Sequence, residues 1–428
     1  MFQTLANAWK IADLRKKILY TALLLIIYRI GAHVPTPMIN QQVITSLFSA
    51  STSLFGFLDI ISGGALKNMS IFTLSVGPYI TASIIIQLLT MVIPQWEEMQ
   101  KEGGEEARRK FQEYTRYATV VLALLQGYAT AYGMNVQYQS YYNVQLVLNP
   151  GFWSFSMIAL TWTAGAIFLM WLGEYMNDRG IGNGISFLIF AGIISRLPET
   201  IISIGQSVFT GETAWWQLLI LLAVVIVTIA GVVFVTSGTR RIPVQYAKRQ
   251  VGRRTYGGQT THIPFKVNQA GVLPVIFASS LLMLPQTILS FINADWAASL
   301  ENSFGWNSPA HTTVYMLLIL FFSYFYTAMQ FNPSEVAKNM QKNGGFVPGI
   351  RPGPATSAYL TRIMDRLTLA GAVFLCVLVL LPNLLMLTTN INSGFGGTAI
   401  LIAVGVAMET MKSIETQVKE RHYSGFLG

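Results

Sequence analysis

The sequence predicts an all-α protein that crosses a membrane ten times. Charged residues make up only 11% of its 428 residues, whereas soluble domains average about 25%. Apolar runs of about 20 residues, the length that crosses a hydrocarbon core, recur along the whole chain. Lys and Arg gather in alternate loops between these runs, as they do in polytopic membrane proteins. An ordinary soluble domain is therefore excluded.

The predicted spans follow the apolar runs. They are approximately 18–34, 70–93, 115–134, 153–173, 182–204, 215–236, 270–292, 312–331, 366–387 and 397–414. Residues 2–16 precede them as a short amphipathic helix at the membrane surface. The first run leads into His33-Val34-Pro35 rather than a small-residue cleavage site, so we expect it to be retained as a span.

The basic residues predict the orientation of the chain. Positive loops stay cytoplasmic, and nearly all of the 28 Lys and Arg residues fall on one side together with both termini. Lys67 and Arg196 fall on the opposite side, and Arg29 lies near the end of a span. The formal charge of +9 points to anionic lipids or an anionic partner at the cytoplasmic face.

Ten spans divide into five and five, at residues 1–205 and 206–428. Because five is odd, two similar halves would insert with opposite orientation, an arrangement that places a pathway between them. Between the first two spans, residues 55–66 are apolar but too short to cross, and Gly63 and Gly64 are expected to end a helix there. This segment is either a re-entrant plug or a helix lying on the outer surface.

The sequence offers little for chemistry. It has no Gly-Lys dipeptide for a phosphate-binding loop, one cysteine, and four dispersed histidines. We therefore expect no enzymatic activity, no metal site and no cofactor. The spans also lack the mid-membrane carboxylates of ion-coupled carriers, which counts against an inverted-repeat solute transporter. That transporter is the alternative function, and a structural membrane scaffold is a third.

Two features bear on whether the chain forms a gated pathway with a docked partner. Isoleucines recur one turn apart in two spans, where they are either packing residues or a constriction that closes by excluding water. Residues 237–268 and 332–360 form basic cytoplasmic loops; the first reads as a structured hairpin, and Arg351 in the second lies on a turn stiffened by Pro and Gly. These loops either bind lipid headgroups or dock an anionic partner.

The chain resembles the SecY family, the pore-forming subunit of the bacterial protein-translocation channel. The resemblance is collinear over nearly the whole chain. It is carried by RIGAHVPTP (29–37), SIFTLSVGPYITASIIIQLLT (70–90), EEARRKFQEYTRY (105–117), RGIGNGISFLIFAGI (179–193), RRIPVQYAKR (240–249), GGQTTHIPFKVNQAGVLPVIFASS (257–280), FNPSEVAKNMQKNGGFVPGIRPG (331–353) and GGTAILIAVGVAMETM (396–411).

The resemblance implies roles for particular residues. It implies a hydrophobic pore ring of Ile80, Ile84, Ile185, Ile189, Ile276 and Ile402, and a plug that includes Phe55, Phe57, Leu58, Ile60 and Ile61. It implies a lateral gate near Gln87, Gln126, Gln286 and Thr287. The docking surface for partners would include Arg240, Arg241, Lys248, Arg249, Arg253, Arg254 and Arg351.

The resemblance also implies a function. The chain would conduct unfolded secretory polypeptides across the bacterial cytoplasmic membrane, recognise their signal peptides, and release transmembrane segments sideways into lipid. SecA or the ribosome would drive it, SecE and SecG would be its membrane partners, and anionic lipids would surround it. No cofactor is implied.

Overall fold

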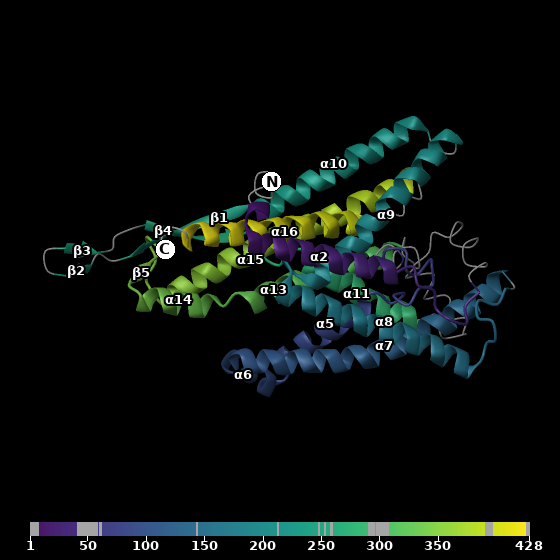
Figure 1. The fold of residues 1–428 in the computed structure, drawn as a ribbon. Coiled ribbons are helices and arrows are strands. Elements are labelled where there is room, and N and C mark those ends of the chain that lie inside the picture. The colour runs from purple at the N-terminus through teal and green to yellow at the C-terminus, as the bar shows by residue number, and fades with distance from the viewer. Residues whose placement is uncertain are drawn as a thin grey trace.

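The structure is a computed structural model. It describes residues 8–40, 59, 62–142, 144–211, 214–246, 249–251, 254–256, 260–289, 296, 308–389 and 397–424. Long helices run roughly side by side, and a β-hairpin projects from one end of the bundle (Figure 1). The predicted all-α membrane architecture is confirmed.

Each predicted span coincides with one helix. These helices are α2 (Ala12–Gly31), α5 (Gly77–Val92), α7 (Gly104–Tyr142), α8 (Phe152–Arg179), α9 (Gly184–Phe209), α10 (Trp215–Ser237), α11 (Leu273–Leu289), α13 (Pro309–Gln330), α15 (Pro354–Thr389) and α16 (Gly397–Ser424). Two shorter helices, α6 (Pro94–Glu102) and α14 (Pro333–Lys342), lie between spans. The predicted boundary near residue 206 falls in the last turn of α9, and the division into two inverted halves stays a prediction.

Length and composition identify only some of these helices as spans. Within the described residues, five helices are long and apolar enough to cross a membrane, or six if α5 and α6, bent by 103°, count as one span. α2, α7 and α16 carry charged turns at one end, and α11 has only 17 residues. Charged turns suit helices that continue into water beyond the hydrocarbon core.

Several predicted boundaries are wrong for this reason. α7 begins at Gly104 rather than 115, α15 begins at Pro354 rather than 366, and α16 continues to Ser424. The second predicted span begins too early, since its helix begins at Gly77 rather than at residue 70. Residues 62–76 are instead a series of turns in which Gly63, Gly64, Met69 and Ser75 have positive φ. Pro78, in the first turn of α5, starts the helix.

The segment 62–76 is packed into the bundle. Phe72 is buried, stacks on Tyr28 of α2 and on Phe168 of α8, and belongs to the main apolar core. That core also takes buried residues from α5, α9, α11, α13, α15 and α16. A second core, which includes Met134 of α7 and Trp162 of α8, lies beside it. The helices thus enclose the segment.

Gly165 of α8 lets the segment approach closely, and its replacement should destabilise the fold. A Cβ atom at this position would overlap the carbonyl oxygen of Ile71. We expect Gly165→Ala to cost about 1–3 kcal/mol, the range for overpacking a core. Thermal unfolding in detergent measures the effect. The control is Gly205→Ala in α9, where a Cβ meets nothing within 4 Å; equal melting temperatures for the two variants would contradict the prediction.

Candidate functional site

The six isoleucines of the predicted pore ring lie in one buried cluster. They come from four helices: Ile80 and Ile84 from α5, Ile185 and Ile189 from α9, Ile276 from α11, and Ile402 from α16. None exposes more than 8% of its surface. Residues far apart in sequence are therefore brought together by the packing of α5, α9, α11 and α16.

Local sequence positions the isoleucines of α9. Asn183 caps this helix, and its side-chain oxygen accepts hydrogen bonds from the backbone N–H groups of Ile185 and Ser186. The Asn177 side chain accepts a third bond, 2.6 Å long, from the N–H of Gly184. Since these groups would otherwise lack partners at a helix start, the caps fix where α9 begins. Ile185 therefore falls in its first turn, with Ile189 one turn later.

A small cavity adjoins the isoleucine cluster. Its volume is about 30 Å³, and Ile80, Ile189, Ile276 and Ile402 contribute to its wall. Four hydroxyl-bearing residues, Thr73, Ser75, Ser279 and Ser280, also line it, together with Leu74, Gly77 and Met283. This volume is of the order of one water molecule. Beside these four isoleucines, the cavity therefore has room for about one water molecule.

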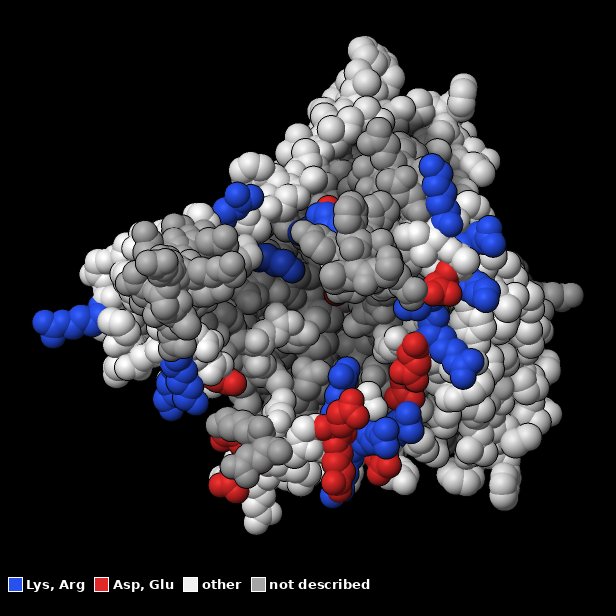
Figure 2. All heavy atoms as spheres, turned by 60° about the vertical axis from the view of Figure 1, so that its left-hand side comes forward, with Lys and Arg blue, Asp and Glu red and all other residues white. Residues whose placement is uncertain are grey.

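The end of the molecule from which the hairpin projects is hollowed. Figure 2 shows this hollow near the centre of the face, with Lys, Arg, Asp and Glu side chains gathered around it. The isoleucine cluster is fully buried within the bundle. The hollow is thus bordered by charged side chains, whereas the isoleucine cluster is apolar and buried.

The predicted lateral gate follows a seam between helices. α11 packs against both α5 and α7, which bear Gln87 and Gln126 respectively, and both glutamines are half-buried. The Gln87 amide nitrogen donates to the Ser83 hydroxyl, whereas its buried oxygen has no donor among the described residues. Gln286 and Thr287 lie on α11, but their side chains are outside the description. The structure therefore brings together α5, α7 and α11, the helices that bear the four predicted gate residues.

The predicted plug is only partly described. Phe55, Phe57, Leu58, Ile60 and Ile61 lie outside the described residues. Asp59 and residues 62–66 are described and lie against α2 and α9. The Tyr28 hydroxyl donates to the carbonyl oxygen of Ser62 at 3.0 Å, and the Arg29 guanidinium donates to that of Gly63 at 2.6 Å. This contact gives Arg29 a partner at the end of its span.

Lys67 and Arg196, the two exceptions to the charge pattern, are neutralised in an ion-pair circuit. Arg196 pairs with Asp59 and with Glu199, and Lys67 pairs with Glu199. The circuit closes because the backbone N–H of Lys67 donates to the Asp59 carboxylate at 2.6 Å. Asp59 and Glu199 were not predicted from the sequence. Lys67 and Arg196 could have indicated them, because two cations on the side with few positive charges need carboxylates nearby.

The two basic loops form one body. β1 (Thr239–Tyr246) pairs antiparallel with β4 (Thr260–Lys266), as the predicted hairpin requires, and also with β5 (Gly345–Phe346) of the second loop. An apolar cluster beneath them joins Val244 of β1, Phe265 of β4, Met340 of α14 and Leu360 of α15. This contact between the two loops was not predicted from the sequence.

The predicted docking residues are spread over this body. Arg240 and Arg241 are exposed on β1. Arg249 and Arg254 belong to β2 (Arg249–Val251) and β3 (Arg254–Tyr256), which pair at the tip of the hairpin. Lys248 and Arg253 lie outside the described residues.

Arg351 occupies the turn that leads into α15. Its side chain is exposed, and Gly349 and Gly353 on either side have φ of 81° and 102°. The Thr356 hydroxyl donates to the Arg351 carbonyl oxygen at 2.8 Å. The glycine-flanked turn predicted around Arg351 is therefore present, and the arginine side chain on it is exposed.

The first described residues of the chain pack against α16. Ala8 and Leu14 near the N-terminus pack with Ile181, at the turn between α8 and α9, and with Ile414 of α16. Lys17 donates to Gln417 at 3.4 Å. The N-terminal residues, the turn that follows Arg179 at the end of α8, and the part of α16 around Ile414 therefore lie together; the membrane side that they face stays a prediction from the charge pattern.

Comparison with known proteins gives consistent results. A family model described as SecY matches residues 70–411. The protein translocase subunit SecY of Streptomyces scabiei is 47% identical to this chain, and that of Halalkalibacterium halodurans is 45% identical. Both alignments cover 100% of this chain and of the relative.

Solved structures share the fold. One described as the structure of a protein conducting channel aligns with a TM-score of 0.64 at 19% identity, and covers 94% of this chain and 91% of its own. Sec61 from the canine ribosome–channel complex aligns with a TM-score of 0.61 at 18% identity, with the same coverage. The family model and the full-length relatives agree, and the chain belongs to the SecY family.

Proposed function

We propose that this chain is a protein-conducting channel subunit that passes unfolded secretory polypeptides across the bacterial cytoplasmic membrane. The observation that carries the proposal is the convergence of six isoleucines from four helices in one buried cluster. β-Branched apolar side chains around a pathway close it to water and ions, yet they can part around a polypeptide.

The proposal assigns lateral release to the seam between α5, α7 and α11. The half-buried Gln87 and Gln126 lie on two of these helices. The Gln87 oxygen has no donor among the described residues; a buried acceptor without a donor costs about 1–3 kcal/mol, so this position would favour opening of the seam. A signal peptide or transmembrane segment that enters here would meet lipid directly. Gln286 and Thr287 complete the proposed gate.

The proposal assigns the work of driving transport to partners. SecA or a ribosome would dock on the basic body formed by the two loops, where Arg240, Arg241 and Arg351 are exposed. Anionic lipids would meet the remaining cytoplasmic cations. The Sec61 relative is known in a ribosome–channel complex, which supports the ribosome as a partner. The chain itself would perform no chemistry.

SecE and SecG would be the membrane partners. The end of α9 and the start of α10 diverge from the bundle (Figure 1), and large apolar side chains cover them, including Ile201, Phe209, Trp215 and Leu222. In the apolar stretch of α10 that is long enough to cross a membrane, only 17% is buried inside the protein. A partner helix of SecE type would cover part of this surface.

Reconstitution tests the function. Proteoliposomes containing this chain and a SecE-type partner would receive SecA, ATP and a precursor protein. We expect the precursor to become protected from external protease, and to remain accessible when ATP is omitted. Uptake of small solutes without precursor protection would instead favour the solute transporter.

Both termini are proposed to be cytoplasmic, and cysteine labelling tests this. In a Cys376→Ser background, Lys342→Cys at the end of α14 should react with an impermeant maleimide only from the cytoplasmic side. Thr210→Cys, in the exposed turn after α9, should react only from outside. Labelling of both cysteines from one side would contradict the proposed topology.

A further inference from the structure

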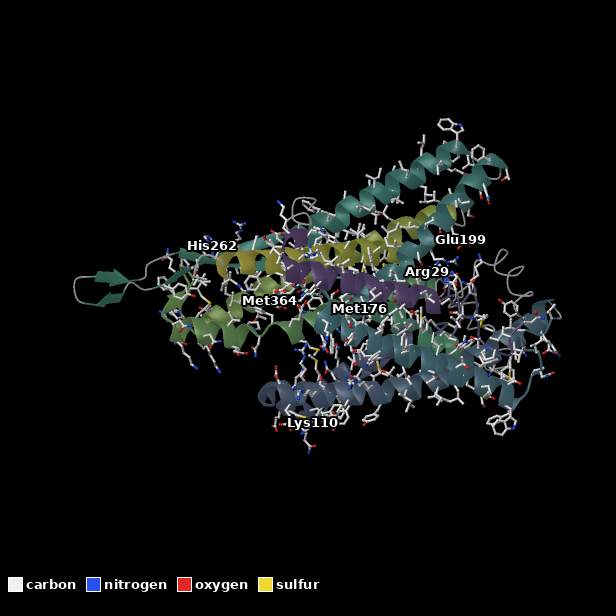
Figure 3. All side chains as sticks on the ribbon, viewed as in Figure 1. Arg29, Lys110, Met176, Glu199, His262 and Met364 are labelled. Atoms are coloured by element: carbon white, nitrogen blue, oxygen red, sulfur yellow. The ribbon has the colours of Figure 1, made fainter. Side chains whose placement is uncertain are left out.

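We propose that the ion-pair circuit of Asp59, Lys67, Arg196 and Glu199 is a latch that holds the described part of the plug segment against α9 and sets how strictly the channel stays closed. These four are positioning residues, and the inference rests on the proposed function. Figure 3 shows Arg29 and Glu199 at the same end of the bundle, opposite His262 of β4 and Met364 of α15.

The charges balance within the circuit. Two cations and two carboxylates meet in three ion pairs, so their sum is zero. This balance explains how Lys67 and Arg196 can lie on the side from which positive charge is otherwise excluded. A charge left unpaired here would be both partly buried and on the disfavoured side. Each cation of the circuit is therefore compensated by a carboxylate.

The two arms of the circuit differ in burial. The Asp59 side chain is fully buried and that of Arg196 is 17% exposed, whereas the side chains of Lys67 and Glu199 are 29% and 53% exposed. An exposed pair is weak and is screened by salt, whereas removing one partner of a buried pair leaves a charge without compensation. Asp59 and Arg196 thus carry most of the latch.

Hydrogen bonds beside the circuit seat the backbone on α9. Gly63 has φ of 67°, and a Cβ atom added to it would lie 2.8 Å from the Cα of Gly192. Its carbonyl oxygen accepts from Arg29, which also donates to the Ser195 hydroxyl at 3.2 Å. The segment therefore rests directly on the turn of α9 that precedes Arg196.

The same face of α9 bears the latch and part of the isoleucine cluster. Ile185, Ile189, Gly192 and Arg196 are spaced by four, three and four residues, which aligns them along one face of a helix. Seven residues separate Ile189 from Arg196, about 10 Å along the axis. Movement of α9 that parts the isoleucines must therefore strain or break the circuit. The latch therefore favours the closed arrangement of the plug segment and of the isoleucine cluster.

Charge reversal and charge exchange test the latch. The full chain with its SecE-type partner would be reconstituted, and two quantities measured: efflux of a small fluorescent anion, and translocation of a precursor with a defective signal sequence. We expect Arg196→Asp and Asp59→Arg each to raise efflux about tenfold, which corresponds to about 1.4 kcal/mol, and to admit the defective precursor. The exchange Asp59→Arg with Arg196→Asp should bring efflux back toward the wild-type value.

Milder variants and a control keep the test decisive. Arg196→Gln serves if a reversal yields no folded protein, and Lys67→Gln should have a smaller effect that fades at high salt. Lys419→Gln removes an exposed pair with Glu415 on α16 and should leave efflux unchanged. Wild-type efflux in both Arg196 variants, or no recovery in the exchange variant, would overturn the latch. Failure of the wild-type protein to translocate an intact precursor would instead overturn the proposed function.

Discussion

Ile84→Asn should make the closed channel leak ions and accept substrates with defective signal sequences. Ile84 is 1% exposed and lies within the isoleucine cluster. While the cluster is closed and dry, the asparagine amide would be buried without hydrogen-bond partners. When the cluster opens, water would hydrate this amide. A buried unpaired polar group costs about 1–3 kcal/mol, which would shift the closed–open equilibrium about 5- to 150-fold. Anion efflux from proteoliposomes measures the shift.

Ile402→Asn should act in the same direction but less strongly. Ile402 borders the small cavity, whose wall includes the hydroxyls of Ser279 and Ser280, so the new amide can find a partner. Ile158→Asn is the matched control, because Ile158 is equally buried but belongs to the second core. If Ile158→Asn leaks as much as Ile84→Asn, the leak reflects general destabilisation and the cluster is not the closure.

Arg351→Glu should abolish SecA-driven translocation while leaving membrane insertion and association with SecE intact. The Arg351 guanidinium is exposed on a turn fixed by two glycines with positive φ, so it can present a rigid fork to a carboxylate. Removing one partner of a docked charge pair costs about 2–5 kcal/mol, whereas one cation at a lipid surface contributes about 1 kcal/mol. Precursor protection and SecA binding measure the effect.

Arg351→Lys separates docking from lipid binding. Lysine keeps the charge but loses the fork, so it should be clearly impaired if Arg351 docks a partner. Arg362→Glu, a reversal at an exposed arginine of α15, controls for the change in net charge. Translocation at the wild-type rate by Arg351→Glu would remove this residue from the mechanism.

Much of the fold could be read from local patterns. Each predicted span contains a helix because the signal, an apolar run of sufficient length, is contained within the segment. The hairpin of β1 and β4 was likewise predicted from its own residues. The predicted boundaries were less accurate, because α7, α15 and α16 extend beyond the apolar runs. Their additional turns are charged, so they do not appear in a pattern of apolar residues.

The candidate site was less accessible to such reasoning. From their spacing alone, the isoleucines at 80, 84, 185 and 189 could be packing residues or the constriction of a pathway. Only the resemblance to the SecY family placed them in one ring with Ile276 and Ile402. Their common burial depends on how α5, α9, α11 and α16 approach one another. The pairing of β1 with β5 joins two loops about 100 residues apart, and no local pattern encodes such a contact.

The sequence by itself determined the class of the protein and the positions of its spans, because hydrophobic length acts within each segment regardless of its neighbours. The membrane side of the charged loops stays a prediction from the same kind of local pattern. Only the tertiary structure decided where Lys67 and Arg196 find their carboxylates, and that residues 62–76 fold as turns against α2, α8 and α9. Those outcomes depend on distances between residues remote in sequence. A buried cation requires a partner, but only the packing of the helices determines which carboxylate lies within reach.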